Sequence, residues 1–123
     1  MLRGAVVILL DPEGRTLLLK RHESSKFAPN KWGFPGGKIE EGETASEAAR
    51  RETGEETSLV VMGLKDLGRF QFVRAYLATD YEGDVMIDHE HTDWAWVRND
   101  DLGKYDLAPN VLEIYDRALK YGH

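Results

Sequence analysis

A helix with a clear beginning and end divides this sequence in two. Thr44 is followed three residues later by Glu47, which predicts a capping box that closes the first helical turn. The residues between and after them add helix propensity and a small-residue face: Ala45, Ala48 and Ala49. The helix is expected to run to about Glu56 and to stop near Thr57-Ser58. The remaining elements therefore fall into two groups, one before and one after this helix in the sequence.

Short apolar runs on either side of this helix predict β-strands. Residues 5–10 form a continuous run of Ala, Val, Ile and Leu that predicts a buried strand. A turn is expected at 11–14 and a returning strand at 16–19, so the two strands would form a hairpin. A polar surface loop is expected at 21–33. The strands expected after the helix are 59–62, 70–73, 76–79 and 94–97.

A second helix is predicted near the C-terminus. Pro109 suits a first helical turn, and the apolar residues after it recur at helical spacing: Val111, Leu112, Tyr115, Ala118 and Leu119. The order of strands, helix, strands and helix predicts an α/β (α+β) fold, a mixed β-sheet flanked by helices. The length is that of one ordinary domain, so residues 1–123 are expected to form a single domain.

The composition narrows the classes of function. The chain has 22 acidic and 16 basic residues, so its net charge is −6. This charge argues against a protein that binds nucleic acid by charge neutralisation. An acidic protein can still bind a phosphate if a divalent cation lies between them. The chain has no cysteine, which excludes disulfides and thiolate metal sites. The run at 5–10 is too short to cross a bilayer, so a soluble, cytoplasmic protein without a membrane partner is expected.

Three glutamates near the end of the central helix, Glu52, Glu55 and Glu56, share one helical face. The like-charge i,i+4 pair costs about 0.2–0.5 kcal/mol, and carboxylates at a helix C-terminus cost about 0.3–1 kcal/mol each. No Lys or Arg follows at 58–60 to compensate. A solvated acidic face is the alternative interpretation, but a bound hard cation would offset these costs. Because Mg²⁺ is commonly shared between carboxylates and substrate phosphates, phosphoryl chemistry is the natural inference.

The same stretch resembles the Nudix box, a pattern of glycine, glutamate, Arg-Glu, Glu-Glu, glycine and an aliphatic residue. Residues 37–59 match it at Gly37, Glu43, Arg51, Glu52, Glu55, Glu56 and Leu59. Residues 32–40 also look typical of this family. Ser58 stands where the family usually has glycine, and it is expected to alter the closing turn and not the chemistry. The resemblance implies a Nudix-like α/β/α sandwich and a pyrophosphohydrolase that cuts a phosphoanhydride bond in a nucleotide or nucleotide derivative.

The resemblance also implies a metal site. The three glutamates of the helix face would bind divalent cations, with Mg²⁺ as the expected cofactor and Mn²⁺ as an alternative. The backbone carbonyl of Gly36 or Gly37 would be a further ligand, since glycine lets the backbone approach closely. Arg51 would orient the cluster by pairing with Glu43 or Glu55.

One more carboxylate is expected from the segment before the last predicted strand. Many relatives carry a metal-binding or base glutamate there, which indicates Glu90, with Asp88 and Asp93 as substitutes. Either Glu52 or Glu90 would be the general base. His89 and His91 flank Glu90, but a zinc site is not predicted because no third nitrogen or sulfur ligand converges with them.

Candidate substrate contacts are basic or aromatic. Those for the phosphate chain are Lys20, Arg21 and Lys38. Arg21 is preferred because relatives often place an arginine just after this hairpin. Those for stacking on a base are Phe27, Trp32, Phe70 and Tyr76. For any single aromatic, packing in the core is the simpler interpretation.

The substrate class stays open at this point. A tyrosine near position 76 is associated in the family with dinucleoside polyphosphate hydrolases, and the lack of proline between Pro35 and Pro109 weakens an ADP-ribose assignment. The short chain and residues 34–42 also resemble hydrolases of oxidised deoxynucleoside triphosphates. An RNA 5′-pyrophosphohydrolase would need a more basic surface. A non-catalytic nucleotide-binding module would usually have lost a glutamate, so an enzyme is favoured. The resemblance also admits a homodimer.

Overall fold

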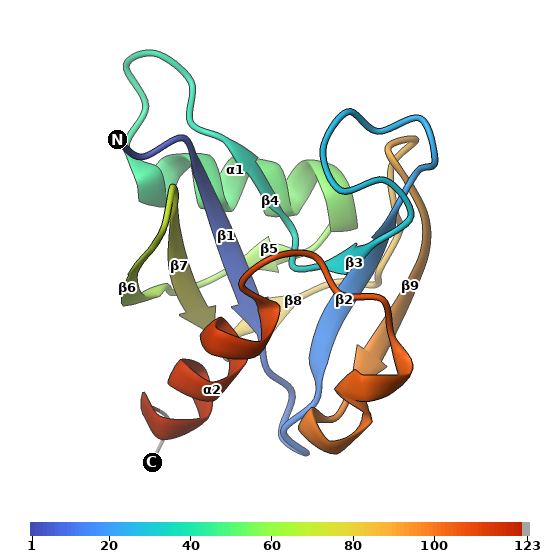
Figure 1. The fold of residues 1–123 in the computed structure, drawn as a ribbon. Coiled ribbons are helices and arrows are strands. Elements are labelled where there is room, and N and C mark those ends of the chain that lie inside the picture. Colours follow the sequence, from blue (N-terminus) through green and yellow to red (C-terminus); the bar gives the residue numbers. More distant parts are fainter. Residues whose placement is uncertain (122–123) are drawn as a thin grey trace.

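The computed structural model describes residues 1–121, in which β-sheets lie between two helices (Figure 1). The strands are β1 (Gly4–Leu9), β2 (Thr16–Arg21), β3 (Trp32–Gly33), β4 (Gly36–Lys38), β5 (Val60–Val61), β6 (Lys65–Phe70), β7 (Val73–Ala78), β8 (Tyr81–Glu82) and β9 (His91–Val97). The helices are α1 (Ala45–Thr57), the short 3-10 helix η1 (Asn99–Lys104) and α2 (Val111–Tyr121). No helix within residues 1–121 is long and apolar enough to cross a membrane.

The largest sheet is mixed. Its strand order is β4-β1-β7-β6, with β1 parallel to β7 and antiparallel to β4. A second, antiparallel sheet has the order β3-β2-β9, and β5 pairs with β8 in a two-stranded ribbon. This mixed arrangement with flanking helices confirms the predicted fold class.

Alternate residues of β1 face two separate cores. Ala5 and Val7 pack under α1, where the small side chains of Ala48 and Ala49 let the helix approach the sheet. Ile8 points the other way, into a core closed by four residues of α2: Val111, Ile114, Tyr115 and Ala118. Figure 1 shows the two helices on opposite sides of the sheet. The central strands are therefore buried on both faces, which explains their uninterrupted apolar runs.

The predicted hairpin between residues 5–10 and 16–19 is wrong. The turn itself forms, since Asp11 N–H donates to Arg15 O at 2.9 Å and Leu10 bridges to Thr16. Beyond it the strands separate, because β1 pairs with β4 and β7 while β2 pairs with β3 and β9. Each strand is buried on both faces and pairs along its whole length with a strand of its own sheet, β1 with β7 and β2 with β9.

The strand predicted at 70–73 is also wrong. Phe70 ends β6, Val73 begins β7, and Gln71 between them has a left-handed φ of 58°, so the segment is a turn. Strand β6 was missed because its sequence is largely polar and includes Gly68, next to a register shift. The predictions at 59–62, 76–79 and 94–97 fall on β5, β7 and β9 with shifted ends.

Candidate metal centre

Helix α1 carries the predicted glutamates, and both of its ends are fixed. Thr44 Oγ1 accepts a hydrogen bond from Glu47 N–H at 3.1 Å, and Glu47 Oε1 accepts one from Thr44 N–H at 2.9 Å. The predicted capping box is therefore confirmed. At the other end, Ser58 adopts a φ of 67° and its N–H donates to Gly54 O at 2.9 Å. The last turn contains no basic residue.

Arg51 organises one side of the acidic cluster. Its Nε and Nη2 donate to the two carboxylate oxygens of Glu43 at 2.7 and 3.0 Å, which is a bidentate pair. Its Nη1 donates to Glu52 Oε1 at 2.8 Å and lies 3.4 Å from Glu55 Oε2. Hydrogen bonding to Arg51 holds the pKa of Glu43 at about 2. The pairing with Glu43 that the resemblance implies is thus present.

Two glycines of β4 let the sheet approach this helix. A Cβ atom at Gly37 would lie 2.6 Å from Glu52 Cδ, closer than real Cβ contacts allow. Gly36 N–H donates to Glu56 Oε1 at 2.9 Å. The Gly37 carbonyl oxygen lies beside Gly4 of β1, 3.0 Å from where a Cβ of that residue would be. At the contact between β4 and α1, the backbone amide of Gly36 therefore faces Glu56.

Glu56 is the buried member of the cluster. The residue is only 3% exposed and takes part in no salt bridge within residues 1–121. Burial, together with the negative charges of Glu52, Asp88 and Glu90, raises its pKa to about 9, against the lowering effect of the Gly36 N–H. A buried carboxylate surrounded by like charges is costly unless a cation neutralises it. The donor chemistry of this site therefore fits a divalent metal ion.

Asp88 and His91, from the segment that leads into β9, lie close to Glu56. One ligand atom from each of these three residues lies within 4.8 Å of the other two. His91 Nδ1 is 2.7 Å from Asp88 Oδ1, and the His91 side chain is 3% exposed. The sequence interpretation named Asp88 only as a substitute and did not include His91 in the site. An Asp and a His three residues apart at the start of a strand were the available signal.

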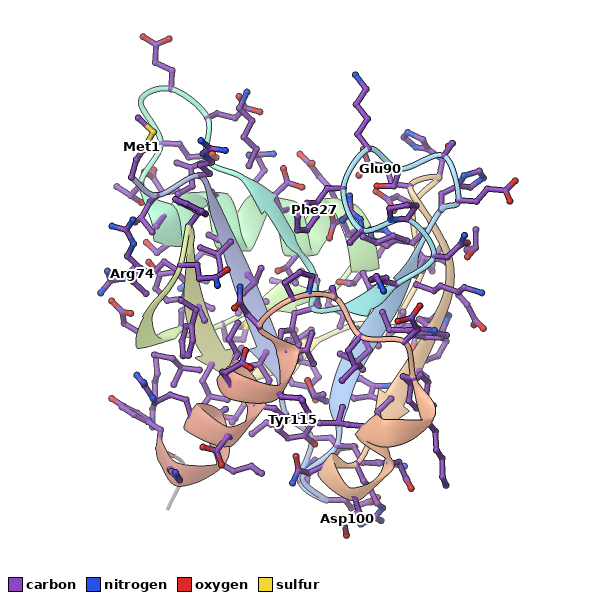
Figure 2. The ribbon with its side chains drawn as sticks, viewed as in Figure 1. Met1, Phe27, Arg74, Glu90, Asp100 and Tyr115 are labelled. Carbon is purple, nitrogen blue, oxygen red and sulfur yellow. The ribbon has the colours of Figure 1, made fainter. Side chains whose placement is uncertain are left out.

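Glu90 and Asp93 are exposed, unlike Asp88 and His91. The Glu90 backbone oxygen accepts a hydrogen bond from His22 N–H at 3.0 Å, and its side chain is exposed beside the 22–31 loop (Figure 2). Asp93 is exposed, and its Oδ1 accepts the Trp94 N–H at 2.7 Å. The structure therefore brings Asp88 into contact with the buried cluster, while the Glu90 charge acts on Glu56 from the rim.

A cavity of about 610 Å³ adjoins the cluster on the side of the sheet covered by α2. His91, Gly36 and Gly37 line it where it meets the cluster, and Arg21 and Lys38 also belong to its lining. Its other walls are mainly apolar or aromatic, and they include Val6, Phe34, Phe72, Val111 and Ile114. A mostly apolar hollow with a few charged groups beside an acidic cluster is suited to a small organic anion.

The remaining predicted contacts have structural partners. Arg21 Nε donates to Phe27 O at 2.7 Å, so this side chain orders the loop that follows β2. Trp32 packs edge-on against Tyr105, with ring centroids 5.0 Å apart. Tyr76 is 7% exposed in the core under α1 and is not part of the cavity lining. Of the predicted substrate residues, the structure brings Arg21, Phe27 and Lys38 to the cavity.

A mixed sheet between two helices, with an arginine-organised acidic cluster on one of them, defines a protein of the Nudix fold. The model of the NUDIX domain matches residues 1–118, and the chain belongs to the Nudix hydrolase family.

Two relatives extend this comparison. A nucleoside triphosphatase (NudI) of Salmonella agona (strain SL483) is 31% identical over a 138-residue alignment that covers 96% of each chain. An RNA pyrophosphohydrolase of Caulobacter vibrioides is 38% identical over 85 residues, which is 69% of this chain but 45% of that relative. Among solved structures, a MutT Nudix hydrolase from Burkholderia pseudomallei has a TM-score of 0.81 at 24% identity, covering 95% of this chain and 98% of its own. That likeness supports the fold.

Proposed function

We propose that this chain hydrolyses a phosphoanhydride bond of a nucleoside triphosphate, with Mg²⁺ as its cofactor, at the cluster formed by α1, β4 and the start of β9. The observation that carries the proposal is Glu56, a buried carboxylate without a cationic partner among the described residues, next to the Arg51-bound Glu52. Gly36, whose N–H donates to Glu56, lines a cavity large enough for a nucleoside.

The proposed metal ligands are Glu52, Glu55 and Glu56, with Asp88 or Glu90 completing the set. When bound, Mg²⁺ would neutralise charge developing on the phosphate oxygens and lower the pKa of a bound water. Arg51 keeps the Glu52 carboxylate in place through its Nη1.

The attacking water must give its proton to a carboxylate, for which Glu52 and Glu90 are the two candidates. Glu52 is held between Arg51 and the backbone of Gly37, so its position is already fixed. Glu90 is exposed and would have to be ordered by metal or substrate. Comparing Glu52→Gln with Glu90→Gln in single-turnover assays distinguishes them, because loss of the base slows the chemical step itself.

The cavity would take the nucleoside, and its basic residues would face the phosphates. Lys38 extends β4 next to the two glycines, and Arg21 lies on the neighbouring wall. Phe34 and Phe72 offer aromatic surface in the same lining. Stacking on such surfaces tolerates several bases, so the cavity accounts for nucleotide binding without naming the base.

The nucleoside triphosphate is preferred because the relative named for that activity matches this chain along nearly its whole length. A dinucleoside polyphosphate loses support, because the tyrosine associated with it, Tyr76, packs in the core. A triphosphorylated RNA 5′ end is the second candidate, favoured by the Caulobacter relative. The net charge of −6 argues against it.

The test is incubation of purified protein with nucleoside triphosphates (oxidised ones included), dinucleoside polyphosphates, ADP-ribose and triphosphorylated RNA, with and without Mg²⁺. We expect Mg²⁺-dependent cleavage of nucleoside triphosphates, and chromatography of the products identifies the phosphorus attacked. Preference for RNA would transfer the proposal to the second candidate. A folded protein that binds nucleotides and hydrolyses none of the panel would instead be a non-catalytic binding module.

A further inference from the structure

His91 occupies an unusual place among the histidines within residues 1–121. Its side chain is 3% exposed, whereas His22 is half-buried and His89 is exposed. It is the first residue of β9, where the pairing with β2 changes register: Lys20 lies opposite Asp93, and Arg21 lies opposite His91. Such an irregularity re-aims a side chain. Here it accompanies an imidazole that lines the cavity.

Asp88 fixes the orientation of this imidazole. An ionised carboxylate can only accept hydrogen bonds, so the proton of the 2.7 Å contact belongs to His91 Nδ1. The His91 backbone N–H also donates to Asp88 O at 3.3 Å. A cation that took the place of the Nδ1 proton would be bound by Asp88 Oδ1 and His91 Nδ1 together, as adjacent ligands 2.7 Å apart.

The spacing of the three side chains suits a single ion. Metal–ligand bonds of about 2.0–2.2 Å place two ligand atoms at most about 4.4 Å apart. The ligand atoms of Glu56, Asp88 and His91 already lie within 4.8 Å of one another. Small side-chain rotations would therefore close the group around a cation. The buried carboxylate of Glu56, bonded to Gly36 N–H, supplies negative charge at this place.

The ligand types indicate which ion. Mg²⁺ prefers oxygen ligands and keeps several waters, whereas imidazole nitrogen suits first-row transition ions. We propose that Glu56, Asp88 and His91 form a second metal position, which shares Glu56 with the Mg²⁺ ligands Glu52 and Glu55 and adds a nitrogen ligand, and that this position selects a transition ion such as Mn²⁺ over Mg²⁺. This inference rests on the proposed role of Glu56 as a metal ligand.

Mn²⁺ alone is a direct probe, because pulsed electron paramagnetic resonance detects a nitrogen bonded to it. Metal-free full-length protein is titrated with Mn²⁺, and the ¹⁴N modulation is recorded for the wild type, His91→Asn and His89→Asn. We expect imidazole coupling in the wild type and in His89→Asn, and its loss in His91→Asn. Mn²⁺ affinity should fall about 10- to 100-fold in His91→Asn, with a smaller change for Mg²⁺. His89→Asn is the matched control, because His89 lies two residues away and is exposed.

Absence of nitrogen coupling in the Mn²⁺-loaded wild type would overturn the inference and would leave Asp88 and His91 as a structural hydrogen-bonded pair. Coupling that persists in His91→Asn, or that disappears in His89→Asn, would overturn it too. If His91→Asn does not fold, ¹⁵N-histidine labelling of the wild type shows whether the coupled nitrogen belongs to a histidine, because the coupling must then change from ¹⁴N to ¹⁵N, and the same label in His89→Asn excludes His89. Mg²⁺-supported hydrolysis without nitrogen coupling removes this inference alone, whereas coupling without hydrolysis of any nucleotide removes only the proposed function.

Discussion

The two long helices cover opposite faces of the same sheet, yet they bury different kinds of side chain. The side chains that α2 buries are apolar or aromatic: Val111, Ile114, Tyr115 and Ala118. Those that α1 buries include three polar ones: Thr53, Glu56 and Thr57. Helix α2 has Glu113 in its first turn and Lys120 in its last, as the helix dipole favours. Helix α1 ends in glutamates with no basic residue in its last turn. Helix α2 thus buries side chains that stabilise the fold by packing, whereas α1 places glutamates where burial and the helix dipole disfavour negative charge.

The largest expected effect is on catalysis by α1. Glu56→Gln keeps the size and the contact with Gly36 N–H but removes the charge that would hold a cation. Loss of such a preorganised charge costs roughly 10²–10³-fold in rate. We therefore expect kcat with Mg²⁺ to fall by about that factor while the folded structure is kept, as measured by steady-state assays and circular dichroism.

The matched control is Glu113→Gln on α2, an exposed glutamate far from the cluster in the sequence. Its kcat should equal that of the wild type. If Glu56→Gln retained wild-type turnover, the assignment of this carboxylate as a metal ligand would be wrong. A similar loss in both variants would mean that a general loss of charge, and not the site on α1, causes the effect.

The second prediction concerns packing by α2. Ile114 is 2% exposed in the core under this helix, so Ile114→Ala should lower the free energy of unfolding by about 2–5 kcal/mol. Urea denaturation measures the change. Leu112 on the same helix is 57% exposed, and Leu112→Ala should change the value by less than about 0.5 kcal/mol. Equal effects of the two substitutions would contradict the burial of one face of α2.

The same contrast explains how much of the fold the sequence could predict. Both long helices were placed correctly because their signals are local: a capping box for α1 and apolar spacing for α2. The pairing of strands was harder, since it depends on partners far apart in the chain. Residues 5–10 and 16–19 were expected to pair with each other, but β1 instead runs parallel to β7, about seventy residues away. An apolar run identifies a buried strand without identifying its neighbours.

The candidate site was predictable only where its carboxylates lie close together in the sequence, on one helix. The spacing of Glu52, Glu55 and Glu56 is visible in the sequence, and so is the glycine pair that approaches them. His91 was not identified, because its place beside Glu56 depends on a register shift between β2 and β9. Tyr76 was proposed to contact substrate, but strand alternation turns it toward α1 and away from the cavity. The way a strand pairs within its sheet decides which face each of its residues occupies.

A third prediction uses the raised pKa of Glu56, about 9 in the folded protein against an ordinary 4.5. The folded state then holds a proton that the unfolded state releases, so this stabilisation is complete below pH 4.5 and is lost as the pH rises toward 9. The free energy of unfolding of the metal-free protein should fall by up to about 1.4 kcal/mol per pH unit. In Glu56→Gln this component disappears, so urea denaturation at pH 5 to 8 should give a flatter profile. Parallel profiles for the two proteins would contradict the assignment.

The smallest expected effect lies at the end of α1, at the position where the sequence departs from the family pattern. Ser58 has a φ of 67°, a left-handed conformation that costs a residue with a Cβ about 1–2 kcal/mol. Glycine removes that cost but loses about 0.5–1 kcal/mol of chain entropy, and the hydrogen bond from Ser58 Oγ to Met86 O at 3.2 Å is lost as well. Ser58→Gly should therefore raise the free energy of unfolding by no more than about 1 kcal/mol, with kcat unchanged. Ser58→Ala, which loses the hydrogen bond and keeps the Cβ, should be less stable than Ser58→Gly. If the alanine variant were the more stable of the two, the backbone at the end of α1 would not be strained. The loss of stability in α1 would then come from its glutamates alone.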